Sequence, residues 1–124
     1  MAGFLVHADF DSATFHRLAS FKSATFESVA HFNSVAFSGD ADFGSVSFKE
    51  SAYFGSALFK GVARFKSASF AAGASFSRAY GGASIPATFA AEADFGSATF
   101  ARGLPEEVVK YYSPPAVGAE DATG

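Results

Sequence analysis

The chain of 124 residues contains no cysteine and no tryptophan, and charged residues make up only 17% of it. Without cysteine, this chain forms no disulfide and offers no thiolate ligand to a metal. Its charged fraction lies below the roughly 25% of an ordinary globular domain, and its net charge of −3 is too small to indicate a nucleic-acid-binding protein. No run of about 18 apolar residues is present, and the first ten residues do not resemble a signal peptide, because no basic residue precedes their short apolar stretch. These absences predict a single cytoplasmic domain whose partner is neither a membrane nor a nucleic acid.

Phenylalanine, by contrast, is abundant, and its 17 positions form one regular series. Successive phenylalanines are alternately six and five residues apart up to Phe76, which gives a period of eleven residues. After one gap of thirteen residues, the alternation resumes at Phe89. Fixed spacing of this kind is the signature of a repeat architecture. The phenylalanines that we expect to form the interior of the repeat are Phe10, Phe15, Phe21, Phe26, Phe32, Phe37, Phe43, Phe48, Phe54, Phe59, Phe65, Phe70, Phe76, Phe89, Phe95 and Phe100.

A second regularity is the small residue that lies two places before every phenylalanine, which is alanine or, in two units, valine. In an extended segment, residues i and i − 2 point to the same side, so each unit places one small and one large apolar side chain inward. A helix would put these two residues on nearly opposite faces, and the units are too short for the strands of an ordinary sheet. The pattern therefore predicts an all-β solenoid in which each unit forms one face and the chain turns at each junction.

The repeat unit resembles that of a known family, the pentapeptide-repeat proteins in their phenylalanine-centred form. The resemblance is carried by units such as 13–15 (Ala-Thr-Phe) and by the stretch 37–43 (Phe-Ser-Gly-Asp-Ala-Asp-Phe), and it covers about residues 2–103. It implies a right-handed quadrilateral β-helix with four faces per coil, a central stack of phenylalanines and an inner layer of small residues. This chain departs from the strict five-residue form, because alternate units carry one extra residue.

Two coil sizes fit the spacing, and they differ in which residues are neighbours on adjacent coils. Two units of five residues and two of six make a coil of twenty-two residues, in which Asp9 lies beside His31. A flat, two-faced solenoid with eleven residues per coil instead places Ser20 between them. We expect the four-faced coil, mainly because of the resemblance, and we retain the two-faced solenoid as the alternative.

The pattern is interrupted between Phe76 and Phe89, where eight additional residues predict a loop over about 79–86. Two consecutive glycines permit turns there, and a proline sets the angle at which the chain returns. The loop is either a tolerated insertion at a corner or a candidate partner-binding loop, because loops on rigid scaffolds often carry function. Its candidate contact residues are Tyr80, Gly81, Gly82 and Ile85.

Residues 104–112 predict a short helix that follows the repeat domain of residues 1–103. Pro105 stands near the start of this segment, and acidic residues occupy its first turn, where the helix dipole favours them. Its apolar residues are spaced to form one face, which either caps the last coil or makes a dimer contact. These residues are Leu104, Val108, Tyr111 and Tyr112. We expect residues 113–124 to form a flexible tail.

The residues that could carry chemistry do not form a recognisable catalytic motif. Of the three histidines, only His7 stands close in the sequence to two carboxylates, those of Asp9 and Asp11. We expect these side chains on a convex, wet surface, whereas catalysis needs a cleft that excludes water. Phosphate-binding, hydrolase and zinc-protease motifs are missing, and we expect the basic side chains to be scattered around different faces. The sequence therefore predicts neither an enzyme nor a cofactor or metal site.

The expected function is that of a non-enzymatic scaffold that presents a surface to a protein partner. The resemblance implies a narrower alternative, since some pentapeptide-repeat proteins mimic duplex DNA, bind DNA gyrase or another type II topoisomerase and confer quinolone resistance. Against this alternative, residues 1–103 contain eight acidic and eight basic residues, so the net negative charge lies in residues 104–124. A further alternative is a structural protein that forms homodimers or longer assemblies through the ends of its solenoid. A regular threonine array that would suit adsorption to ice is missing.

Overall fold

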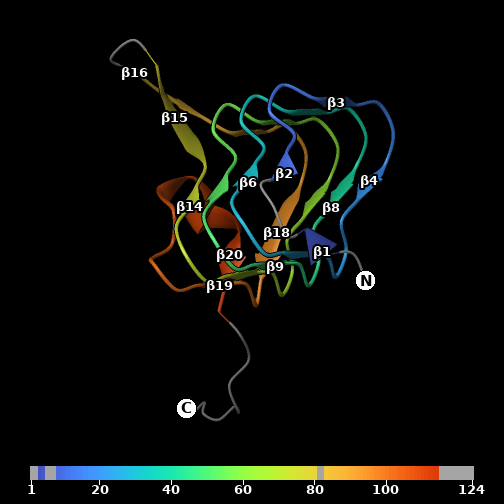
Figure 1. The fold of residues 1–124 in the computed structure, drawn as a ribbon. Coiled ribbons are helices and arrows are strands. Elements are labelled where there is room, and N and C mark those ends of the chain that lie inside the picture. Colours follow the sequence, from blue (N-terminus) through green and yellow to red (C-terminus); the bar gives the residue numbers. More distant parts are fainter. Residues whose placement is uncertain (1–2, 5–7, 81–82, 115–124) are drawn as a thin grey trace.

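The computed structural model describes residues 3–4, 8–80 and 83–114, and it shows a chain wound into a coil with four faces (Figure 1). Each face is a parallel sheet to which every coil contributes one short strand. Face 1 consists of β1 (Gly3–Phe4), β5 (Thr25–Phe26), β9 (Ser47–Phe48), β13 (Ser69–Phe70) and β19 (Thr99–Phe100). Face 2 consists of β2 (Ala8–Asp9), β6 (Ala30–His31), β10 (Ala52–Tyr53) and β14 (Ala74–Ser75).

The other two faces complete each turn of the coil. Face 3 consists of β3 (Thr14–Phe15), β7 (Ala36–Phe37), β11 (Leu58–Phe59) and β17 (Thr88–Phe89). Face 4 consists of β4 (Ala19–Ser20), β8 (Ala41–Asp42), β12 (Ala63–Arg64), β18 (Ala93–Gly96) and β20 (Tyr112–Ser113). The expected all-β solenoid is therefore confirmed.

The register of the strands decides the size of the coil. Asp9 pairs with His31, and His31 pairs in turn with Tyr53, so neighbours on a face are separated in the sequence by four whole units. Asn33 donates its backbone N–H to Oδ1 of Asp11 at 2.7 Å, again across one coil. The four-faced coil is confirmed, and the two-faced alternative is wrong, because Ser20 lies on face 4 and not between Asp9 and His31.

Phenylalanine rings fill the interior in four columns. Rings on successive coils lie nearly parallel, with centroids 4.6–5.2 Å apart, and rings of neighbouring columns meet edge to face, as Phe32 and Phe43 do at 5.4 Å. Such arrangements suit the ring quadrupole. Eleven of these rings are at most 1% exposed, namely Phe26, Phe32, Phe37, Phe43, Phe48, Phe54, Phe59, Phe65, Phe70, Phe76 and Phe95. The other five phenylalanines that we expected in the interior lie toward the two ends of the coil and are only partly buried. They are Phe10, Phe15, Phe21, Phe89 and Phe100.

Serine forms the corners that follow the five-residue units. Seven serines have φ between 55° and 63°, the left-handed region that L residues rarely adopt. They are Ser12, Ser23, Ser34, Ser45, Ser56, Ser67 and Ser97. The backbone N–H of such a serine donates to a carbonyl of the next coil, as Ser45 does to Lys66 at 2.9 Å. Each tight corner therefore keeps its backbone hydrogen bond despite the unusual conformation.

The insertion between Phe76 and Phe89 is a β-hairpin that projects from the coil (Figure 1). Its strands are β15 (Ser77–Tyr80) and β16 (Ala83–Pro86), so the excursion begins two residues earlier than the sequence predicts. Gly81 and Gly82 lie outside the described residues, as does the side chain of Tyr80. The hairpin does not disturb the register of the coil, because Phe59 still pairs with Phe89.

The C-terminal segment covers the last coil. It forms a 3-10 helix, η1 (Glu106–Tyr111), and then β20, which pairs with β18. Val108 is 0% exposed, and the ring of Tyr111 lies 5.1 Å from that of Phe89. Leu104 is 36% exposed, so the packed face that we expected does not bury it. The flexible tail predicted from residue 113 begins in a paired strand, and residues 115–124 lie outside the described residues. Within the described ranges, no helix has the length and apolar character needed to span a bilayer.

Candidate partner-binding surface

The outward side chains differ from coil to coil, and face 2 illustrates this. Asp9, His31 and Tyr53 follow one another across adjacent strands, and the rings of His31 and Tyr53 are stacked with their centroids 5.5 Å apart. His16 follows β3 on face 3 and is exposed, and His7 lies outside the described residues. The described part of the chain contains no group of three or more side chains placed to hold a metal ion.

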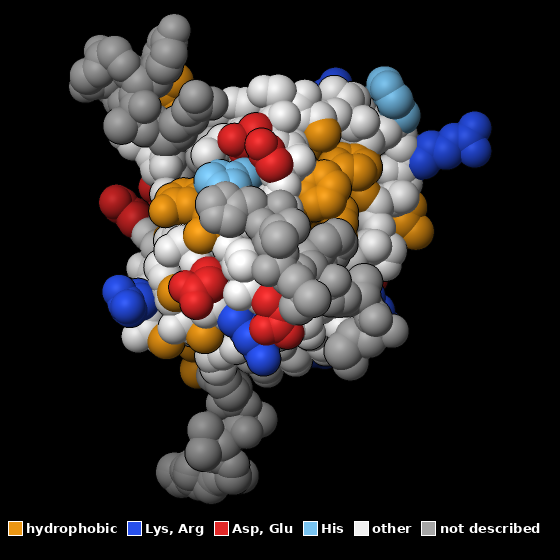
Figure 2. All heavy atoms as spheres, viewed as in Figure 1, with side chains coloured by type: hydrophobic (Ala, Val, Ile, Leu, Met, Phe, Trp, Pro, Cys, Tyr) orange, Lys and Arg blue, Asp and Glu red, His pale blue; other side chains and the backbone are white. Residues whose placement is uncertain are grey.

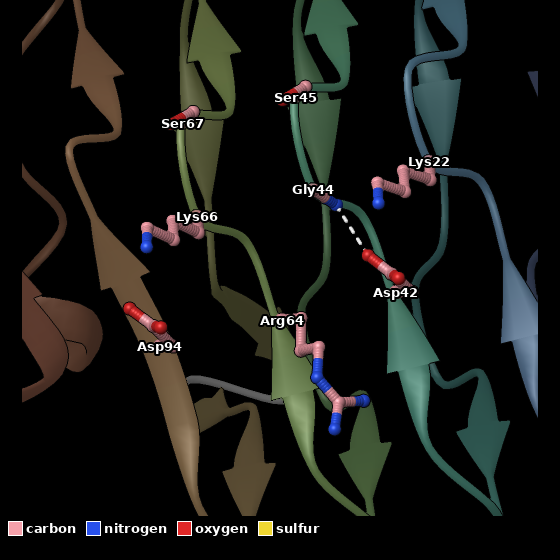
Figure 3. A pocket seen from close by; sticks show the side chains of 8 residues that line it. All are labelled: Lys22, Asp42, Gly44, Ser45, Arg64, Lys66, Ser67 and Asp94. Carbon is pink, nitrogen blue, oxygen red and sulfur yellow. Dashed lines mark hydrogen bonds between the residues drawn. The ribbon is translucent and has the colours of Figure 1, made fainter.

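Face 4 carries a set of charged side chains that line a hollow. Two columns of outward residues run along this face. The residues directly before its phenylalanines are, on successive coils, Ser20, Asp42, Arg64 and Asp94. The residues directly after these phenylalanines are Lys22, Gly44, Lys66 and Gly96. A hollow of about 420 Å³ is lined by six residues of these columns and by two of the corner serines (Figure 3), namely Lys22, Asp42, Gly44, Arg64, Lys66 and Asp94 with Ser45 and Ser67. A second hollow of about 460 Å³ shares Arg64 and Asp94 with the first and extends to Tyr111 of η1.

Backbone N–H groups hold the two aspartates of this surface in place. Oδ1 of Asp42 accepts a hydrogen bond from the N–H of Gly44 at 2.8 Å, and Asp94 makes the same contact with Gly96 at 2.7 Å. A Cβ at Gly44 or Gly96 would lie only 3.0 Å or 2.9 Å from the carboxylate oxygen. Glycine therefore leaves room for each carboxylate to accept this hydrogen bond, and Gly44 lines the hollow without adding a side chain to it.

Arg64 is partly committed to an ion pair at the edge of the face. Its Nη1 lies 3.3 Å from Oδ2 of Asp40, whose Oδ1 accepts the backbone N–H of Val62 at 2.9 Å. The hydrogen bond from Val62 and the adjacent guanidinium lower the pKa of Asp40, although partial desolvation opposes them. Both side chains are substantially exposed, and an exposed pair of this kind contributes little to stability. Its effect is to hold the guanidinium in position.

Lys22 and Lys66 are the uncommitted cations of face 4. Both are exposed, and neither forms an ion pair within the described ranges, where the other bridge joins Lys49 to Glu27 on face 1. In Figure 3 each of the two lysines leans toward the following coil. The hollow that the two lysines line therefore presents free ammonium groups beside carboxylates that are already hydrogen-bonded.

Of the basic residues that we expect to be scattered around different faces, three lie together on face 4, whereas Lys49 follows β9 on face 1 and Lys60 follows β11 on face 3. Lys22, Arg64 and Lys66 share face 4 because the unit of Lys22 and the unit that contains both Arg64 and Lys66 are two whole coils apart. The signal was available in the separation of Lys22 and Lys66 in the sequence, which is twice the length of a four-unit coil. A count of charges over the whole repeat does not reveal this cluster of cations, because the count adds charges from all four faces.

The other candidate contact residues do not join this surface as one group. Ile85 is 40% exposed on β16 of the hairpin, and Tyr111 alone of the expected cap residues lines the second hollow. Val108 is the buried residue of η1 and is therefore a packing residue. Comparison of the chain with protein-family models, with curated proteins and with solved structures finds no match.

Proposed function

We propose that this chain is a non-enzymatic β-helical scaffold that presents its outer faces to a protein partner. The observation that carries the proposal is the contrast between inward and outward positions. Inward, every coil repeats a phenylalanine and a small residue. Outward, a single register of face 2 carries four different side chains in turn, those of Asp9, His31, Tyr53 and Ser75. Packing constrains only the inward residues, so the outward ones are available for recognition.

The chemistry of the interior supports binding over catalysis. Within the described residues the core contains no buried polar or charged side chain. Catalytic groups usually depend on partial burial to shift their pKa values and to exclude water from the reaction. The outward groups of this coil instead stand on sheets that face the solvent, where a rigid surface suits docking.

The resemblance to pentapeptide-repeat proteins supports the same proposal, because it implies a four-faced coil with stacked phenylalanines. Mimicry of DNA would require a continuous acidic surface. On face 4, Arg64 stands between Asp42 and Asp94, and side chains of both signs appear on the face of the molecule seen in Figure 2. General protein binding therefore fits this surface better than the gyrase-directed alternative does.

Affinity capture on the immobilised chain, followed by titration of the captured protein, tests the proposal. We expect saturable binding that weakens at least tenfold when outward residues of one face are replaced and changes less than twofold when the other faces are altered. Binding that is insensitive to substitutions on all four faces would contradict it. The thermally unfolded chain serves as the control, because a scaffold loses its surface when the coil unfolds.

A specific observation supports assembly through the solenoid end as a second candidate function. Phe10, Phe15 and Phe21 are only partly buried, whereas the rings stacked on them from the next coil are fully buried. Partly exposed rings at a sheet edge can pack against a second copy. Light scattering at increasing concentration tests this candidate, and a mass that stays at one chain would exclude it.

A further inference from the structure

We infer that face 4 binds an acidic segment of a partner protein, in extended conformation, through Lys22 and Lys66. This inference rests on the proposed function and specifies the face and the chemistry of the partner. Both hollows described above lie on face 4, and they share Arg64 and Asp94. The two hollows together extend over several coils, and the residues that line them carry charges of both signs.

The charges of face 4 are only partly paired with one another. Arg64 is engaged by Asp40, and Asp42 and Asp94 each accept a backbone N–H. Lys22 and Lys66 are exposed and have no ion-pair partner within the described residues. An anionic segment that enters this hollow would therefore gain two new ion pairs without breaking an existing one.

The spacing of the two lysines suits an extended peptide. Lys22 and Lys66 are two coils apart, which at about 4.8 Å between strands places their backbones about 10 Å from each other. Gly44 lies between them and contributes no side chain. Alternate side chains of an extended peptide are separated by about 7 Å, a distance that two flexible lysine side chains can match. Acidic residues at positions i and i + 2 of an extended segment therefore fit the pair.

The aspartates select the class of partner. Asp42 lies on the coil between the two lysines, and Asp94 lies one coil beyond Arg64. A uniform polyanion such as a nucleic acid would place phosphates against both carboxylates, and like charges in contact are unfavourable. A protein segment can place acidic side chains at the lysines and neutral or basic ones at the aspartates. The mixed charge of the face therefore favours a protein over a nucleic acid.

A peptide titration followed by NMR tests the inference on the full chain. The probe is a capped heptapeptide of threonines that carries glutamate only at its third and fifth positions, and the matched control peptide has lysine at these two positions. At low ionic strength we expect the glutamate peptide to shift the amide signals of Gly44 and Lys66, and the shifts to be lost at high salt, which screens such contacts. The variant K22E/K66E should weaken the affinity at least tenfold.

The matched control variant is K60E/R102E, which makes the same change in net charge at two exposed residues away from face 4. It should change the affinity less than twofold. Absence of amide shifts on face 4, or equal weakening by the two variants, would overturn the inference. Tighter binding of a single-stranded oligonucleotide than of the glutamate peptide would overturn it as well, because it would assign the face to nucleic acid.

Capture of the natural partner separates this inference from the proposed function. A partner that binds wild type and K22E/K66E equally would preserve the scaffold function and overturn the assignment of face 4. A partner lost from K22E/K66E and retained by K60E/R102E would support both. Binding of the glutamate peptide to face 4, combined with failure to find any saturable protein partner, would leave the site and contradict the scaffold function.

Discussion

Each ring in the middle of the coil is held by contacts in two directions, and Phe54 shows both. It is 0% exposed and lies parallel to Phe32 and Phe76 at 4.9 Å and 5.0 Å. It also meets Phe43 and Phe65 edge to face, each at 5.5 Å. Burial of one phenylalanine contributes about 1.5–3 kcal/mol, and each favourable ring pair adds about 0.5–1.5 kcal/mol. Phenylalanine thus provides both the hydrophobic drive and the geometry that aligns successive coils.

Replacement of Phe54 by alanine should lower the free energy of unfolding by about 3–5 kcal/mol, because the cavity would lie among rings that have little freedom to move. Urea denaturation measures the change. Phe21→Ala is the control, since Phe21 is partly buried and stacks on one ring only, that of Phe43. It should cost clearly less. Equal losses at the two positions would show that the ring columns do not determine stability.

The serine corners hold a backbone conformation that glycine adopts at no steric cost. Ser23 is exposed and has φ of 63°. A left-handed residue costs about 1–2 kcal/mol, which glycine avoids, whereas glycine adds roughly 0.5–1 kcal/mol of entropy loss on folding. Ser23→Gly should therefore stabilise the chain by about 0.5–1 kcal/mol in thermal or urea denaturation. Ser69→Gly, in strand β13, should destabilise it instead.

Two elements interrupt or end the repeat, and each is anchored to it differently. The hairpin leaves the coil at the corner between faces 2 and 3, and its last residues rejoin the ladder, since Ser56 donates its N–H to the carbonyl of Ile85 at 3.2 Å. The 3-10 helix is anchored instead by the buried side chain of Val108 and by the ring contact of Tyr111, and the ring of Tyr112 in the adjoining β20 adds a further contact. The hairpin is thus an addition to the coil, whereas the helix covers part of its core.

Removal of residues 78–85 together with Pro86→Ser should leave the coil intact, because it restores a five-residue unit with serine at its corner. We expect the free energy of unfolding to change by no more than about 1 kcal/mol, because surface changes that remove no core contact, helix cap or buried hydrogen bond usually have small effects. The same deletion with Pro86 retained is the control. It should be less stable, since proline cannot adopt the positive φ of the other corners. Loss of cooperative unfolding in the serine version would show that the hairpin is needed for folding.

Substitution of Val108 by aspartate should detach the C-terminal cap. The loss of apolar burial alone corresponds to about 1.5–3 kcal/mol, and a carboxylate buried without a partner adds to the cost. Light scattering should then show aggregation through the uncovered last coil. Val109→Asp is the matched control, because Val109 is 52% exposed and belongs to the same helix. Aggregation of both variants to the same degree would argue against a capping role.

The whole molecule is a stack in which each coil contacts mainly its neighbours. The strand pairs on all four faces join residues of adjacent coils, and no strand pairing within the described residues skips a coil. Stability in such a stack approximates a sum of the contributions of each coil and of each interface between coils. The number of coils can therefore change without any change in the packing of the core.

Duplication of residues 46–67, which form one complete coil, should give a longer and more stable protein. The m-value and the denaturation midpoint should both rise, because more surface is exposed on unfolding and one more interface is present. Small-angle scattering should show a molecule about 4.8 Å longer along the axis. A lower midpoint would indicate that the hairpin or the cap depends on the natural number of coils.

Much of this architecture follows from the sequence alone because the repeat is simple. Phenylalanine and a small residue two places before it specify which side chains point inward, and the insertion appears as a break in the spacing. The coil size does not follow from the spacing, because a coil of two units and a coil of four units both preserve the same period. Pairing of Asp9 with His31 decides between them. The bounds of the hairpin and the exposure of Leu104 also depend on local backbone geometry that apolar spacing does not encode.

The sequence by itself determined the solenoid, its phenylalanine interior and its interruption, since the burial of apolar side chains requires a regular alternation that is visible in the chain. Only the tertiary structure decided which outward residues become neighbours. Lys22 and Lys66 are far apart in the chain but only two coils apart in space, with Gly44 between them. The physical reason is that outward side chains interact with water in the isolated strand and with each other only after the coils stack.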